Sequence, residues 1–148
     1  MSKQEEAGLI LKLYELRREE TMRVARDWYF RDFHPQTFAD FQATLMGPHS
    51  GHVRMVVTYW DMAAAFVNSG AISAELFNEC NGEHFGVFMK VDKLLPEIRK
   101  MVGPNFAVNL EKMIDATPGG RERLEFMRER MKGIFEALKA QQAQAAKS

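Results

Sequence analysis

Apolar residues recur along the chain at spacings of three and four, the period of an α-helix that buries one face. Near the N-terminus, Leu9, Leu13 and Leu16 form such a stripe, and the same period continues until a proline at position 35 disfavours further helix. This pattern predicts either one long helix or two helices with a bend near Arg17-Arg18. No run alternates apolar and polar residues, so strands are not expected.

The middle of the chain predicts a helix that is apolar on nearly every side. A short helix is expected over residues 37–46, followed by this helix over residues 53–67, with Ser50 as its N-cap, Trp60 in its core face and Gly70 after its end. Ser73 can cap a further short helix. Helical spacing then runs through residues 85–101, where Pro96 is expected to kink the helix because it lacks a backbone donor.

The C-terminal region carries the most regular pattern. A short helix is expected over residues 106–114, and Thr117 is expected to cap a final helix that has Pro118 in its first position. That helix presents a heptad-like seam of Leu124, Met127, Met131, Ile134 and Leu138. We expect this seam to be buried against the N-terminal leucine stripe of the same chain; the alternative is the same seam of a second copy.

These elements predict an all-α fold, an irregular antiparallel bundle of five to seven helices. With 148 residues the chain has the length of one domain. We expect a single helical domain over residues 1–140 and a frayed Gln- and Ala-rich tail over residues 141–148.

Charge and cysteine content narrow the classes of function. Twenty Lys and Arg balance twenty Asp and Glu, so no net field favours nucleic acid. Cys80 is the only cysteine, and neither a leader sequence nor an apolar run of about twenty residues is apparent. We therefore expect a cytoplasmic protein without a membrane span or a nucleic-acid partner.

One segment resembles a known family. Three stretches carry the resemblance: Tyr59-Trp60-Asp61, then Phe66–Phe77, which includes Asn68-Ser69-Gly70-Ala71-Ile72, and then Leu94-Leu95-Pro96-Glu97-Ile98. They are similar to the corresponding stretches of an uncharacterised family of small helical bacterial proteins of unknown function. The similarity covers about a third of the chain. It implies a helical fold and a bacterial source, and it transfers no catalytic residue. Many members carry an N-terminal hydrophobic anchor that this sequence lacks, and a tryptophan often found before the Leu-x-Pro step is replaced by Phe88-Met89.

Three local patterns are candidate sites of chemistry. His49-x-x-His52 could contribute to a metal site, but no further ligand pattern accompanies it, so we expect neither metal nor cofactor. Cys80 and His84 lie four apart, yet we expect a structural thiol because no orienting partner follows from the sequence. The turn Thr117–Arg121 suits an anion, but it matches no phosphate-loop pattern, and we expect an ordinary helix start there.

The leading hypothesis is a non-enzymatic helical interaction or scaffold domain, with a protein partner or a second copy of itself. The alternative is a bundle that binds a small apolar ligand, and an enzyme of unidentified class is third. Consecutive aromatic residues near position 29 cannot all face one side of a helix. The candidate interaction or ligand residues are Trp28, Tyr29, Tyr59 and Trp60, with Asp61 and Arg99 as polar anchors.

Overall fold

The helices divide the chain more finely than its periodicity suggests. The structure is a computed structural model that describes residues 2–147. In this range it contains α1 (Lys3–Arg17), α2 (Glu20–Arg31), α3 (Phe38–Leu45), α4 (Ser50–Asn68), α5 (Ala74–Cys80), α6 (Glu83–Met89), the 3₁₀ helix η1 (Asp92–Leu94), α7 (Leu95–Val102), α8 (Val108–Ala116) and α9 (Gly120–Lys147). The all-α prediction is confirmed, because no strand occurs among these residues.

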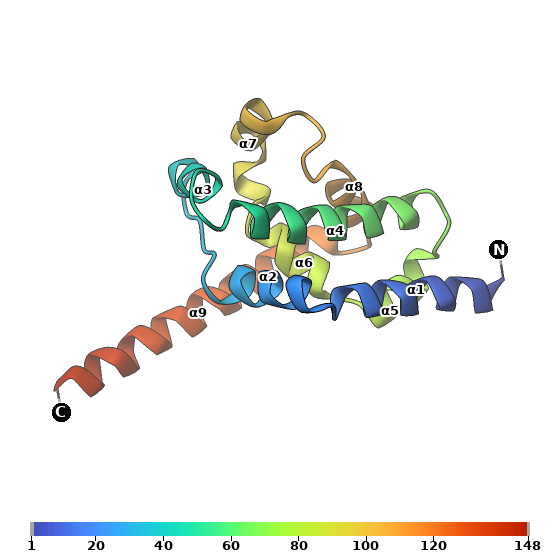
Figure 1. The fold of residues 1–148 in the computed structure, drawn as a ribbon. Helices are drawn as coiled ribbons and strands as arrows, with labels where there is room; N and C mark the ends of the chain where they lie inside the picture. The colour runs from blue at the N-terminus through green and yellow to red at the C-terminus, as the bar shows by residue number, and fades with distance from the viewer. Residues whose placement is uncertain (1, 148) are drawn as a thin grey trace.

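The predicted number and arrangement of helices are corrected. Nine α-helices occur in the described range, more than the expected five to seven. Neighbouring helices also cross: in Figure 1, α3 is seen end-on while α4 runs across the view, so the bundle is not simply antiparallel.

Two breaks account for the additional helices. Glu19 accepts hydrogen bonds from the backbone nitrogens of Thr21 and Met22, both at 3.1 Å, and so starts α2 as a helix separate from α1. Further along, α6 ends at Met89 and α7 begins at Leu95. Pro96 therefore lies in the first turn of α7, where its missing donor costs nothing, and the predicted kink is wrong.

The helix caps follow the sequence only in part. Ser73 accepts a hydrogen bond from the Leu76 nitrogen at 3.3 Å, as predicted. Gly70 ends α4 with a φ of 88°. Ser50, however, is the first residue of α4, behind His49 at the N-cap. Thr117 ends α8 by donating to the Met113 carbonyl at 2.8 Å, instead of capping the final helix.

Helix α4 is the centre of the core. It packs against α2, α3, α5, α6 and α8, which surround it on several sides (Figure 1). Its buried side chains are Val53, Val56, Val57, Tyr59, Trp60, Ala63, Ala64 and Val67. On the remaining side Met55, Met62 and Phe66 are partly exposed. The prediction of a central helix is thus confirmed, with one apolar edge left at the surface.

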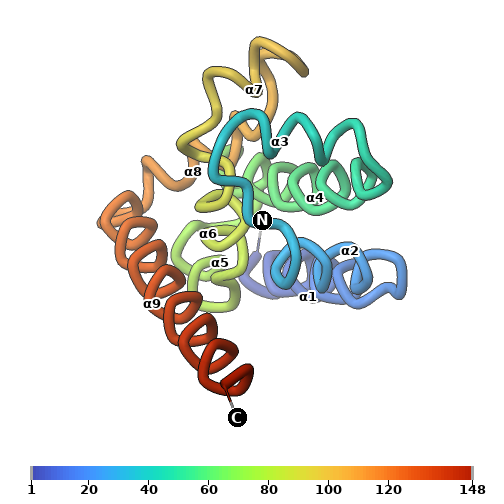
Figure 2. The backbone as a smooth tube through the Cα atoms, turned by 90° about the vertical axis from the view of Figure 1, so that its left-hand side faces the viewer, coloured from blue at the N-terminus to red at the C-terminus, as the bar shows by residue number. Residues whose placement is uncertain are grey.

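Helix α9 does not pack against the N-terminal stripe. It lies on α6 and α8, whereas α1 packs on α2, and Figure 2 shows α5 and α6 between α9 and α1. In α1 the buried apolar residues are Ile10 and Leu13, while Leu9 and Leu16 are exposed. The expected pairing of the two stripes within one chain is therefore wrong.

The start of α9 depends on a close backbone approach. A Cβ atom added to Gly120 would lie 2.2 Å from the Ile114 carbonyl oxygen, so only glycine fits where α9 folds back on α8. At its other end α9 continues to Lys147, through residues predicted to fray. Figure 1 shows this last part projecting away from the other helices.

Replacement of Trp60 by alanine tests the assigned core. Trp60 is 1% exposed on α4, and we expect Trp60→Ala to lower the free energy of unfolding by about 3–5 kcal/mol. Phe126→Ala is the matched control, because Phe126 is 64% exposed, and its effect should stay within about 0.5 kcal/mol. Urea unfolding of the two variants measures both values. Equal losses would mean that Trp60 is not a core residue.

Candidate functional site

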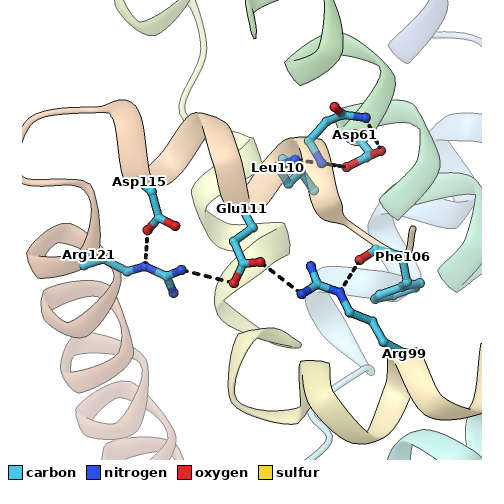
Figure 3. Close-up of polar contacts among 8 residues, drawn as sticks. Asp61, Arg99, Phe106, Leu110, Glu111, Asp115 and Arg121 are labelled. Atoms are coloured by element: carbon cyan, nitrogen blue, oxygen red, sulfur yellow. Dashed lines mark hydrogen bonds and ion pairs between the residues drawn. The ribbon is translucent and has the colours of Figure 1, made fainter. Parts of the chain in front are cut away.

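The Asp61 carboxylate accepts hydrogen bonds from the first turn of helix α8. Its Oδ1 accepts hydrogen bonds from the backbone nitrogens of Asn109 and Leu110, both at 2.9 Å, and its Oδ2 accepts from Asn109 Nδ2 at 3.1 Å (Figure 3). The N-cap residue of α8 is Ala107, with a φ of 55° and no side-chain oxygen. Asp61 therefore supplies from α4 the capping oxygen that α8 lacks.

Arg99 belongs to an ionic network that joins α7, α8 and α9 (Figure 3). It donates to the Phe106 carbonyl and to Glu111 Oε1, both at 3.0 Å. Arg121 binds the other oxygen of Glu111 at 3.3 Å and Asp115 at 2.6 Å, and its hydrogen bond to Asp115 raises its pKa. The Arg121 guanidinium is thus already paired, which removes the cation from the anion site considered at Thr117–Arg121.

The polar atoms of three candidate aromatic residues are satisfied inside the core. Tyr29 donates to the Val87 carbonyl at 2.7 Å, and burial raises its pKa. Tyr59 donates to the Leu13 carbonyl, and burial raises its pKa to about 12. Trp60 Nε1 donates to Glu83 at 2.9 Å. Each hydrogen bond joins two helices, which is a structural role.

Trp28 lies on α2, and its ring packs against the start of α4. It is half-buried, and its ring stacks on His49 with centroids 4.7 Å apart and planes 18° apart. The structure thus brings together Tyr59 with Trp60, whose rings are 5.0 Å apart, and places Asp61 and Arg99 against α8. It does not gather the six candidate residues around one cavity.

Glu83 is an important residue that sequence reasoning missed. Its carboxylate accepts two hydrogen bonds from Arg26, at 2.6 and 2.8 Å, in addition to the one from Trp60. The hydrogen bond to Glu83 raises the pKa of Arg26. Because these partners are 57 and 23 positions away in the chain, local spacing carries no signal for them.

Cys80 and His84 do not form a pair on one helix. Cys80 is exposed at the end of α5, whereas His84 is buried near the start of α6. His84 donates from Nε2 to Asn78 Oδ1 at 3.2 Å, and its buried Nδ1 has no hydrogen-bond partner among the described residues. Burial lowers the pKa of His84 to about 3, with a further contribution from Arg123. His84 is therefore a neutral core residue at physiological pH.

The Lys90 ammonium group donates hydrogen bonds to backbone carbonyls at and just beyond the C-terminal end of α2. Its Nζ donates to the carbonyls of Tyr29 and Phe33, at 2.9 and 2.7 Å, and to Nδ1 of His34 at 3.0 Å. Burial lowers the pKa of Lys90 to about 8. The His34 ring in turn meets the ring of Phe135 on α9 edge to face, 4.6 Å between centroids. This contact ties the middle of α9 to the end of α2.

The seam of α9 changes from buried to exposed along the helix. We call its residues Leu124, Met127, Met131, Ile134 and Leu138 the α9 seam. Leu124 is 1% exposed, Met127 and Met131 are half-buried, and Ile134 and Leu138 are 46% and 47% exposed. The prediction that the whole seam is buried within the chain is wrong, because no other helix reaches its distal half in Figures 1 and 2.

Other features of the described residues define no assembled centre. No group of three or more His, Cys, Asp or Glu side chains is placed to hold a metal ion within residues 2–147. An open hollow of about 720 Å³ lies along α2, lined by Glu20, Arg23, Val24, Arg26, Asp27 and Phe30, none of them a candidate residue. None of the helices in this part of the chain combines the length and apolarity that a membrane crossing requires.

The fold and its surface define an all-helical domain whose buried polar groups serve the fold, with an apolar helix face left uncovered. Residues 4–117 match a family described as a domain of unknown function, DUF4760, and the chain belongs to this family. The match ends before α9 begins. No curated protein and no solved structure matches the chain. The expected membership of an uncharacterised family is confirmed, and the family name assigns no activity.

The buried His84 predicts a pH dependence of stability. Its pKa is about 3 in the folded protein against 6.5 for a free imidazole. Between these values only the unfolded chain binds the proton, so the free energy of unfolding falls as pH drops below about 6.5, by at most about 1.4 kcal/mol per pH unit from this group. Urea titrations from neutral pH to roughly pH 5 should show a shallower slope for His84→Gln than for the parent. Identical slopes would contradict a neutral buried His84.

Proposed function

We propose that this protein is a non-enzymatic helical interaction domain that self-associates through the distal half of the α9 seam. The observation that carries the proposal is the exposure of Ile134 and Leu138, 46% and 47%, on a stripe whose first residue, Leu124, is 1% exposed. One continuous apolar face thus leaves the core and runs into solvent.

The C-terminal part of α9 lacks tertiary packing, which supports the proposal that a partner helix covers it. A helix gains most of its stability from tertiary packing of an apolar face, and a short helix without such packing is marginal in water. Beyond Phe135, which contacts His34, α9 extends away from the rest of the chain (Figure 1). A second helix against Ile134 and Leu138 would supply the missing contact.

The occupant that fits this face is a second copy of α9. The spacing of three and four along the seam is the pattern by which two helices interlock, and it is self-complementary, so two identical helices can cover each other around a two-fold axis. The expected pairing with α1 of the same chain does not occur, because α1 packs on α2. The stretch from Ile134 to Lys147, which begins with the first exposed seam residue, spans about two heptads, so the dimer should dissociate on dilution.

The proposal includes a cytoplasmic location. The single cysteine, Cys80, is exposed and unpaired, a state that suits a reducing compartment. Self-association through a helix seam needs neither a disulfide nor an oxidising environment.

A charge placed on the seam tests the proposal. Leu138→Lys puts an ammonium group where the two helices meet, and burying an unpaired charge is costly, so the variant should be monomeric at concentrations where the parent is a dimer. Sedimentation velocity over a dilution series measures the two states. The monomer body should keep its unfolding free energy, because Leu138 makes little contact with it.

The matched control is Ala140→Lys. It adds the same charge two positions further on, at an exposed residue on the other side of the helix, and should leave the dimer intact. A parent protein that sediments as a monomer at every concentration would contradict the proposal. Equal dissociation by both lysine variants would show that charge, and not the seam, controls association.

A further inference from the structure

Two imidazole rings converge at the start of α4. His49 is the N-cap residue, and His52 lies in the first turn. Their Nδ1 atoms are 3.3 Å apart. His49 is exposed and His52 half-buried, so the pair lies at the protein surface.

The rings are held in this arrangement by Trp28 on α2. Trp28 stacks on His49 at 4.7 Å and meets His52 at 5.6 Å between centroids. Trp28 itself stacks on the buried Phe33 at 5.4 Å. The Trp28 ring therefore orients both imidazoles before a ligand binds, which lowers the entropic cost of binding.

The separation of the two nitrogens lies at the long end of the range for a direct hydrogen bond, and it also fits a shared cation. Hydrogen bonds donated by N–H groups cluster at about 2.9–3.0 Å between heavy atoms. In tetrahedral zinc coordination, two nitrogens each about 2.05 Å from the metal lie about 3.3 Å from each other. The observed 3.3 Å between the two Nδ1 atoms equals this second value.

We propose that His49 and His52 bind a divalent transition-metal ion, such as Zn²⁺, Ni²⁺ or Cu²⁺, through their Nδ1 atoms. Imidazole is a preferred ligand for these borderline ions. The sequence-based expectation of no metal rested on the lack of a further ligand pattern, and it did not foresee the convergence of these two nitrogens. The proposal is independent of self-association through α9.

The site is open and of limited affinity. No cluster of three or more His, Cys, Asp or Glu side chains occurs in residues 2–147, so the chain offers two ligands and leaves the other coordination positions to water or an external donor. The positive end of the α4 dipole also lies close and disfavours a cation. We therefore expect reversible binding, weaker than that of a closed site with four protein ligands.

Equilibrium dialysis of the untagged protein against Zn²⁺ tests the proposal. We expect one equivalent to bind, and Cu²⁺ to quench the fluorescence of Trp28, which stacks on a ligand ring. His49→Gln and His52→Gln should each weaken binding about one hundredfold, because the second imidazole binds intramolecularly once the first is engaged. Circular dichroism should show that both variants keep the helical fold, since neither histidine is a core residue.

His34→Gln is the control for unspecific binding to histidine. His34 donates to the Arg31 carbonyl, accepts from Lys90 and forms no part of the pair, so zinc binding should be unchanged in this variant. Absence of saturable binding to the parent would overturn the proposal. Binding that survives replacement of both His49 and His52 would also overturn it, because the ion would then be held elsewhere.

Discussion

A single carboxylate, that of Glu83, joins three helices at the centre of the molecule. It accepts two hydrogen bonds from Arg26 on α2 and one from Trp60 on α4, and Glu83 itself is the first residue of α6. A partly buried charge is tolerated only when its hydrogen-bonding capacity is met. The three helices must therefore meet in one arrangement, and α8 and α9 pack onto the body that they form.

The same requirement explains why most candidate residues serve the fold. Asp61 caps α8, Arg99 pairs with Glu111, and the buried tyrosine hydroxyls donate to carbonyls of other helices. Each of these contacts joins two helices, and among these groups only Arg99 keeps a buried nitrogen, Nη2, without a hydrogen-bond partner in the described part of the chain. The proposals about this protein rest on two surface features, the distal α9 seam and the pair of histidines at the start of α4.

The sequence predicts what depends on local periodicity and misses what depends on distant partners. The all-α class, the central position of α4 around Trp60 and the Ser73 cap follow from spacing and from cap chemistry, and the structure confirms them. The pairing of Glu83 with Arg26 crosses 57 positions, which no local pattern encodes. The regular seam of α9 predicts a covered face but not the partner, because the pattern suits a helix of the same chain and a helix of another equally well. Likewise, His49-x-x-His52 gives the order of two residues, whereas the convergence of their nitrogens depends on the stacking of Trp28.

The central claim is that the distal part of α9 is stabilised by α9 of a second copy of the chain, whereas the helices packed around α4 are stabilised by their own core. Native-state hydrogen exchange, followed by mass spectrometry at several protein concentrations, tests this claim most directly. We expect the amides of α4 to be protected at every concentration, and those of α9 beyond Phe135 to gain protection only as the concentration rises. Protection of the distal amides that is strong and independent of concentration would contradict the account.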